Sequence, residues 1–168
     1  MPAAISDSST LIHLAALGRL ILLREYYTEV LIPPAVWKEV VEEGRGRPGA
    51  REVEEAARVG WLKVVAATDE PLVRLLKREL QDGEAEALAL AVERQVEIVL
   101  LDESEARRVA AVYGLRKTGV VGILIQARLD GKVTSLRQDL DRLRQDAGFW
   151  ITEDLYRQAL EAVGEGTG

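Results

Sequence analysis

Short apolar runs rich in β-forming residues alternate with longer helical stretches along most of this chain. The runs AAIS (3–6), VLI (30–32) and VEIVLL (96–101) are typical of strands, and each is followed by residues with helical spacing. This alternation predicts a three-layer α/β fold, in which a central, mostly parallel sheet has helices on both faces. We expect a single domain over residues 1–163 and a flexible tail over 164–168, GEGTG.

The residue types that are missing exclude several kinds of chemistry. The 168 residues contain no cysteine and one histidine, His13, so disulfides, thiolate nucleophiles, cysteine-bound zinc and sites with two imidazoles are ruled out. His13 lies in the helical stretch LIHLAAL and is interpreted as a packed or half-exposed helix residue. No apolar run reaches the roughly 18 residues of a membrane span, and MPAAISDSS lacks the features of a signal peptide. We therefore expect a cytoplasmic protein with no membrane contact.

Two of the predicted strands end in an aspartate at the turn into a helix. Asp7 follows AAIS and Asp102 follows VEIVLL. In open parallel sheets, ligands bind outside the carboxyl ends of the strands, so both carboxylates face one crevice if their strands are neighbours. The alternative is that each aspartate only caps the helix after it, a common role for this residue.

Three further glutamates are candidates for the same crevice. Glu84 opens the apolar helix DGEAEALALAVERQ (82–95), where it either points along the edge of the core or only stabilises the first turn, and Glu86 competes with it. In IPPAVWKEVVEEG, Glu39 lies beside an apolar stripe, but periodicity does not separate it from Glu42 and Glu43. Several carboxylates without histidine or cysteine suit a hard cation such as Mg²⁺ or Mn²⁺.

A net charge of −6 argues against non-specific binding of nucleic acid over the whole surface. A polyanionic substrate would need the cation together with local arginines. The candidate phosphate-binding side chains are Arg45, Arg47, Arg107 and Arg108. Because arginine is common on exposed helix faces, the default interpretation of each is an ordinary solvated surface charge. The tryptophans could stack on bases, but Trp37 and Trp150 stand in apolar settings that favour burial.

Taken together, four motifs resemble the PIN-like domain superfamily of metal-dependent ribonucleases, in particular a prokaryotic branch related to VapC-type toxins. They are ISDSS, the glutamate of IPPAVWKEVVEEG, the GEAEALALA box and the strand ending LLDE, and the branch also carries an AGFWIT-like C-terminal segment. The resemblance runs from Ala4 to about Leu160. It implies a PIN-like fold with catalytic, metal-binding acids at Asp7, Glu39, Glu84 and Asp102. It also implies supporting roles for Ser8, Ser9, Glu86 and Glu103.

This resemblance predicts a Mg²⁺- or Mn²⁺-dependent endoribonuclease that hydrolyses RNA. A toxin role would add an antitoxin partner and a homodimer. Two departures from the toxin pattern favour an alternative, a catalytically inactive module that binds RNA or protein: Glu84 replaces a frequent aspartate, and Leu100 replaces a frequent threonine. A third hypothesis is a metal-dependent phosphoesterase that acts on small phosphates with the same carboxylates.

Overall fold

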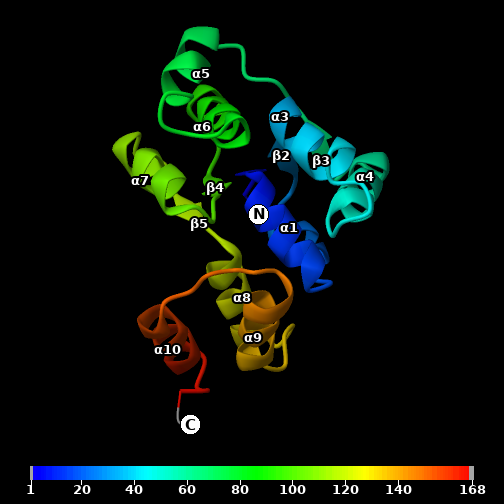
Figure 1. Ribbon diagram of the computed structural model, residues 1–168, viewed down its shortest axis with the longest axis vertical. Helices are drawn as coiled ribbons and strands as arrows, with labels where there is room; N and C mark the ends of the chain where they lie inside the picture. Colours follow the sequence, from blue (N-terminus) through cyan, green and yellow to red (C-terminus); the bar gives the residue numbers. More distant parts are fainter. Residues whose placement is uncertain (1, 167–168) are drawn as a thin grey trace.

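Five short strands form one parallel sheet at the centre of the computed structural model, which describes residues 2–166 (Figure 1). The order across the sheet is β3-β2-β1-β4-β5, and every neighbouring pair is parallel. The strands are β1 (Ala4–Ser6), β2 (Val30–Ile32), β3 (Leu62–Val64), β4 (Ile98–Leu100) and β5 (Lys117–Thr118). The predicted parallel sheet is confirmed.

Helices connect all the strands, and Figure 1 shows three groups of them around the sheet: α5–α7 at the upper left, α3 and α4 on the right, and α8–α10 below. Within residues 2–166, no helix combines the length and the apolar content that crossing a bilayer requires. The helices are α1 (Ser8–Ala16), α2 (Ile21–Tyr26), α3 (Pro34–Trp37), the π-helix η1 (Lys38–Glu42), α4 (Ala50–Val59), α5 (Glu70–Leu76), α6 (Asp82–Arg94), α7 (Ser104–Val112), α8 (Val120–Leu129), α9 (Leu136–Asp146) and α10 (Glu153–Ala162).

Side chains that alternate along the strands create a separate apolar core on each face of the sheet. Ala4 and Leu100 face the core that contains α1, α2, α4 and α8–α10. Ile5 and Val99 face the opposite core, which contains α5, α6 and α7. The alanine-rich α6 is buried nearly all round, as its composition predicts. Two cores on opposite faces confirm the three-layer α/β fold.

The strand order reverses at β1. The chain runs outward from β1 through β2 to β3, and then returns to place β4 on the other side of β1. The carboxyl ends of β1 and β4 coincide, because Ser6 pairs with Leu100 and the Asp7 N–H donates to the Leu100 carbonyl at 3.0 Å. Ligands bind at such reversal points in open α/β sheets. Asp7 and Asp102 lie immediately beyond these two strand ends.

Local sequence features account for the limits of several helices. Thr152 caps α10, since its hydroxyl accepts the Leu155 N–H at 3.0 Å. Pro34 stands at the start of α3, which continues directly into the π-helix η1 and ends at Glu42. Asp69 caps α5, which ends at Leu76. Single π-helical turns occur often at functional sites, and η1 carries Glu39.

One residue of the expected tail is held against the domain. Glu165 accepts hydrogen bonds from the backbone N–H groups of Leu136 and Arg137, at 2.8 and 3.2 Å, and pairs with Arg128 at 2.9 Å. Its carboxylate therefore stabilises the start of α9. The remainder of the tail prediction, residues 167 and 168, lies outside the described residues.

Candidate functional site

Asp7 lies between the end of β1 and the start of α1, and it is only 2% exposed. Its Oδ1 accepts the Thr10 N–H at 2.9 Å, which makes it the N-cap of α1. Its Oδ2 accepts the Asp102 N–H at 3.1 Å. The carboxylate therefore caps a helix and also bridges the ends of two strands, so the two interpretations of Asp7 are compatible.

Burial changes the proton affinity of this carboxyl group. Removal from water, together with the nearby negative charge of Asp102, raises the pKa of Asp7 to about 7. The hydrogen bonds from Thr10 and Asp102 oppose this effect, but they are weaker. Without a cation, Asp7 is therefore protonated in much of the population at neutral pH.

Asp102 is almost fully buried and is held by two donors. Its Oδ1 accepts the Val120 N–H at 2.7 Å, and its Oδ2 lies 2.7 Å from Nδ1 of His13. Because an ionised carboxylate only accepts, we assign the proton to Nδ1 of His13. Gly119 allows this arrangement, since a Cβ at that position would lie 2.4 Å from Oδ1 of Asp102 and 2.8 Å from the Leu101 carbonyl.

Glu39 reaches the site from η1. Its Oε2 accepts a hydrogen bond from the Ser8 hydroxyl at 2.8 Å. A Cβ on Gly83, at the start of α6, would lie 3.5 Å from Oγ of Ser8 and 3.6 Å from Oε2 of Glu39, so the starts of α1 and α6 meet at this carboxylate. Among the three glutamates that periodicity left equivalent in this segment, Glu39 is the one in contact with the residue after Asp7.

The two glutamates at the start of α6 have different environments. Glu84 is 9% exposed, and its Oε1 accepts the Gln81 N–H at 3.1 Å. Burial raises the pKa of Glu84, and the charges of Glu103 and Glu39 raise it further. Glu86 instead accepts the Ala35 N–H at 3.1 Å and lies 3.9 Å from Nζ of Lys77. Glu84 therefore shares the negative field of the site, while Glu86 has a cationic neighbour and holds α3 against α6.

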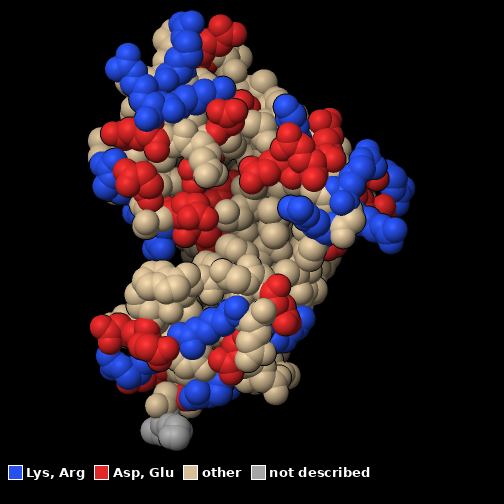
Figure 2. Space-filling view, in the orientation of Figure 1, with Lys and Arg blue, Asp and Glu red and all other residues tan. Residues whose placement is uncertain are grey.

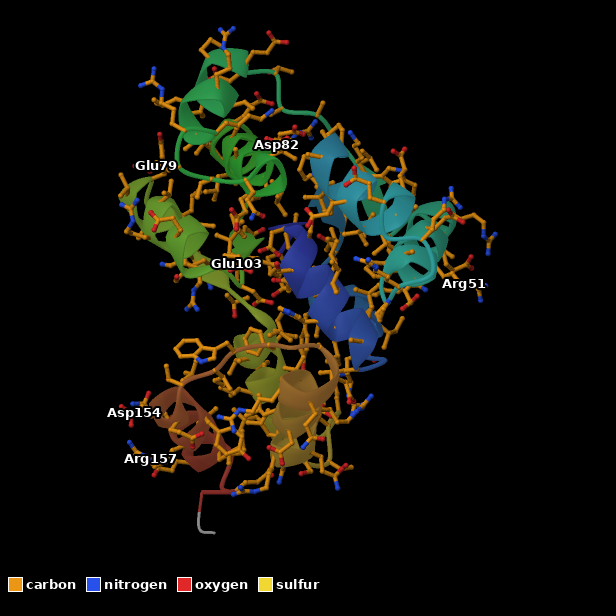
Figure 3. All side chains as sticks on the ribbon, in the orientation of Figure 1. Arg51, Glu79, Asp82, Glu103, Asp154 and Arg157 are labelled. Atoms are coloured by element: carbon orange, nitrogen blue, oxygen red, sulfur yellow. The ribbon has the colours of Figure 1, made fainter. Side chains whose placement is uncertain are left out.

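Glu103 completes an acidic surface around the start of α1. The Ser9 hydroxyl donates to Oε1 of Glu103 at 3.2 Å. Figure 3 shows Glu103 beside α1 at the centre of the molecule, whereas Arg51 points outward from α4. Figure 2 shows red side chains gathered at the centre of this face, above a notch with a mostly tan lower wall. We call Asp7, Glu39, Glu84, Asp102 and Glu103 the acidic cluster.

The acidic cluster offers the donor atoms and the uncompensated charge that a hard divalent cation requires. Asp102 raises the pKa of Asp7, and Glu103 and Glu39 raise the pKa of Glu84. Within residues 2–166, no lysine or arginine forms an ion pair with the cluster. In the side-chain positions shown, however, no three acidic or imidazole groups of the described chain converge closely enough to hold an ion. The donor chemistry fits Mg²⁺ or Mn²⁺, and coordination requires side-chain rotation.

Two hollows flank α1, and each contains one of the predicted phosphate-binding arginines. Arg47 lines a hollow of about 390 Å³ with Glu39, and Arg107 lines one of about 370 Å³ with Asp102. Neither guanidinium forms an ion pair within the described part of the chain. Arg45 lies in a third hollow, beside Arg51 and Glu54.

Arg108 differs from these three arginines, because its guanidinium is already engaged by carboxylates. It pairs with Glu79 at 3.3 Å and with Glu105. The four phosphate-binding roles stay predictions, but the structure gives Arg47 and Arg107 the most favourable positions.

Two residues near the site have environments that differ from the sequence interpretation. His13, interpreted as an ordinary helix residue, holds Asp102. Ser9 and His13 are four residues apart on one helix face, which is the signal that could have linked both to residues 102 and 103. The predicted burial of Trp150 is wrong: its side chain is 80% exposed. The preceding Phe149 is partly buried, and its ring packs edge-on against His13 with centroids 4.8 Å apart.

The fold and the site together define a class: a parallel α/β protein with an acidic cluster where its strand order reverses. A PIN domain family model matches residues 3–165. The chain belongs to the PIN domain family. PIN domains are generally nucleases and typically use divalent metals.

Comparison with solved structures supports the same fold. A PilT N-terminus domain protein from the hyperthermophilic archaeon Sulfolobus solfataricus P2 matches with a TM-score of 0.56 and 16% sequence identity. The match covers 74% of this chain and 92% of that protein. No curated protein matches the sequence. At this identity the likeness concerns the fold alone.

Proposed function

We propose that this protein is a Mg²⁺- or Mn²⁺-dependent endoribonuclease that hydrolyses phosphodiester bonds at the acidic cluster. The observation that carries the proposal is the junction of β1 and β4, where Asp7 accepts the Asp102 N–H and neither carboxylate forms an ion pair with a lysine or arginine within residues 2–166. Burial and the neighbouring charge of Asp102 raise the pKa of Asp7, so a cation would favour its ionised form, and such perturbed groups concentrate at functional sites. Membership of the PIN domain family supports this reaction class.

In this proposal each residue of the site has a distinct task. Asp7, Glu84 and Asp102 hold the cation, and Glu39, oriented by Ser8, binds it or orients the attacking water. His13 keeps the Asp102 carboxylate in place. When bound, the ion lowers the pKa of a water molecule and stabilises the charge that develops on the phosphate. Arg47 and Arg107 pair with phosphates on either side of the bond that is cut.

Cleavage of a mixed RNA panel in Mn²⁺ and in EDTA tests the proposal. We expect fragments in Mn²⁺ and intact RNA in EDTA. Cutting that continues in EDTA contradicts the metal mechanism. Turnover of a nitrophenyl phosphate ester without any cutting of RNA would instead support the small-phosphate hypothesis.

Glu84→Gln and Glu86→Gln form a matched pair, because both side chains accept a backbone N–H and both stand in the first turns of α6. We expect Glu84→Gln to lower Mn²⁺-dependent RNA cleavage by about 100-fold, since it removes a ligand charge but keeps an oxygen for the Gln81 N–H. Glu86→Gln should leave cleavage within about threefold of wild type, because exposed ion pairs such as that with Lys77 contribute little. Initial rates measure both, and equal losses would contradict the assignment.

A non-catalytic RNA-binding module is the second candidate function. Two observations favour it. In the described side-chain positions, no three acids converge. In addition, position 100 is a leucine buried in the core, so the hydroxyl of the threonine that toxins often carry there is missing. Binding of RNA without cutting in either metal would support this candidate. The toxin role, with its antitoxin and homodimer, stays a prediction based on the resemblance.

A further inference from the structure

Trp150 is the most exposed large apolar side chain among residues 2–166. It stands in the segment between α9 and α10, and its neighbour Phe149 is anchored against His13. An indole left in water forgoes the free energy of burying one of the largest apolar surfaces. Phe149 holds the backbone in place while the indole of Trp150 faces solvent, so the indole forms an exposed aromatic platform.

This platform borders the acidic cluster. Trp150 and Phe149 line the same hollow of about 370 Å³ as His13, Asp102, Glu103 and Arg107. We call it the indole hollow. Its volume lies at the lower end of the range of small-ligand sites. Its acidic lining, Asp102 and Glu103, is part of the acidic cluster, and its aromatic lining is Phe149 and Trp150.

The indole hollow also contains a free cation. Arg107 lies one turn into α7, is exposed, and pairs with no carboxylate within the described part of the chain. The next residue, Arg108, is held by Glu79 and Glu105. Of the two adjacent arginines, Arg107 is therefore the one available to a phosphate.

We propose that Trp150 and Arg107 form a subsite for the nucleotide next to the bond that is cut, with its base stacked on the indole and its phosphate paired with Arg107. This proposal rests on the endoribonuclease function above and names the two side chains that would hold an unpaired nucleotide beside the acidic cluster. A base in a duplex is already covered on both faces, whereas an unpaired base can stack on an aromatic ring. Stacking tolerates every base, so we expect little sequence preference from this subsite.

Binding of a labelled 12-nucleotide single-stranded RNA in Mn²⁺, measured by fluorescence anisotropy, tests the subsite without requiring cleavage. The host protein is the full chain with Asp7→Asn, for which we expect cleavage about 10³-fold slower than wild type, so the RNA stays intact during the measurement. We expect Trp150→Ala to weaken binding roughly 5- to 150-fold, the range for one base stacked on an aromatic ring. Trp150→Phe should retain most of the affinity, and a blunt-ended RNA duplex should bind equally with or without the indole.

Two controls separate stacking from other effects. Val112→Ala removes apolar surface from another exposed side chain, 74% exposed at the end of α7, and should leave RNA binding unchanged. Arg107→Ala should reduce the slope of log K against log salt concentration by about 0.7, the value for one phosphate contact on a single strand, whereas Trp150→Ala should not change the slope. Because Trp150 is exposed, circular dichroism of all variants should match wild type.

The outcomes distinguish this subsite from the proposed cleavage. If wild type cuts no RNA but Trp150→Ala still weakens binding, the subsite is supported and the nuclease function is contradicted. If wild type cuts RNA while Trp150→Ala changes neither binding nor KM, the subsite is overturned and the nuclease function remains. If Trp150→Ala leaves RNA binding unchanged but alters the oligomeric state, the indole belongs to a contact between proteins. That result also overturns the subsite.

Discussion

Asp7→Asn is expected to lower Mn²⁺-dependent RNA cleavage by about 10³-fold, because several kcal/mol of metal-based stabilisation of the transition state depend on this charge. The variant should remain folded. Asparagine is as good an N-cap as aspartate, so the amide oxygen can still accept the Thr10 N–H at the start of α1. The bond from the Asp102 N–H is lost, at a cost of about 1–3 kcal/mol, and removal of a buried charge offsets part of it.

Asp69→Asn is the matched control for this substitution. Asp69 caps α5 in the same way, since its Oδ1 accepts the Leu72 N–H at 3.1 Å, but it is exposed and outside the acidic cluster. Initial rates of RNA cleavage and melting temperatures with and without Mn²⁺ are measured on both variants. Asp69→Asn should keep full cleavage and the metal-induced rise in Tm, whereas Asp7→Asn should lose both. Cleavage by Asp7→Asn within tenfold of wild type would contradict a metal-binding role for Asp7.

The sequence predicts the fold well because the pattern that sets the fold is local. Apolar runs such as VEIVLL and the caps that follow them determine where strands and helices begin. Parallel pairing of β1 with β4 then brings Asp7 and Asp102 together, since both follow the carboxyl ends of strands. The expectation that Asp7 and Asp102 lie close together depends only on the strand ends, and the structure brings the two residues into contact.

Contacts between distant elements are not local, and the sequence does not specify them. The distinction between Glu84 and Glu86 depends on where α3 and Lys77 lie against α6. The contact of His13 with Asp102 depends on how α1 crosses the end of β4. The apolar neighbours of Trp150 predict its burial, but Phe149 is the residue that packs against the core at that point, and Trp150 is exposed. In each case three-dimensional packing decides between residues that are equivalent by spacing.

The metal-free protein is expected to lose several kcal/mol of stability as the pH rises from 5 to 8. The pKa of Asp7 is raised to about 7 in the folded protein, from 3.8 in an ordinary aspartate. Between these values the folded state keeps a proton that the unfolded state has released. The free energy of unfolding therefore falls as pH rises through this window and levels off above pH 7. At about 1.36 kcal/mol per unit, the full shift corresponds to about 4 kcal/mol, of which about 2–3 kcal/mol is lost between pH 5 and pH 8.

Glu84 contributes in the same direction, since burial and the neighbouring acids also raise its pKa. Urea denaturation in EDTA at pH 5, 6, 7 and 8 measures the effect. The difference between wild type and Asp7→Asn isolates the contribution of Asp7, because the other titrating groups are common to both proteins. Asp69→Asn should retain the slope of wild type, since Asp69 is exposed.

At pH 7 and above, Mn²⁺ should restore most of the stability that the metal-free protein loses between pH 5 and pH 7. A bound cation favours the ionised carboxylates, so it stabilises the folded state by mass action at high pH. At pH 5 protons compete with the metal, and we expect the same Mn²⁺ concentration to raise Tm much less. The stability in EDTA could instead stay flat or rise between pH 5 and 7, with no difference between wild type and Asp7→Asn. That result would contradict the raised pKa of Asp7 in the metal-free protein.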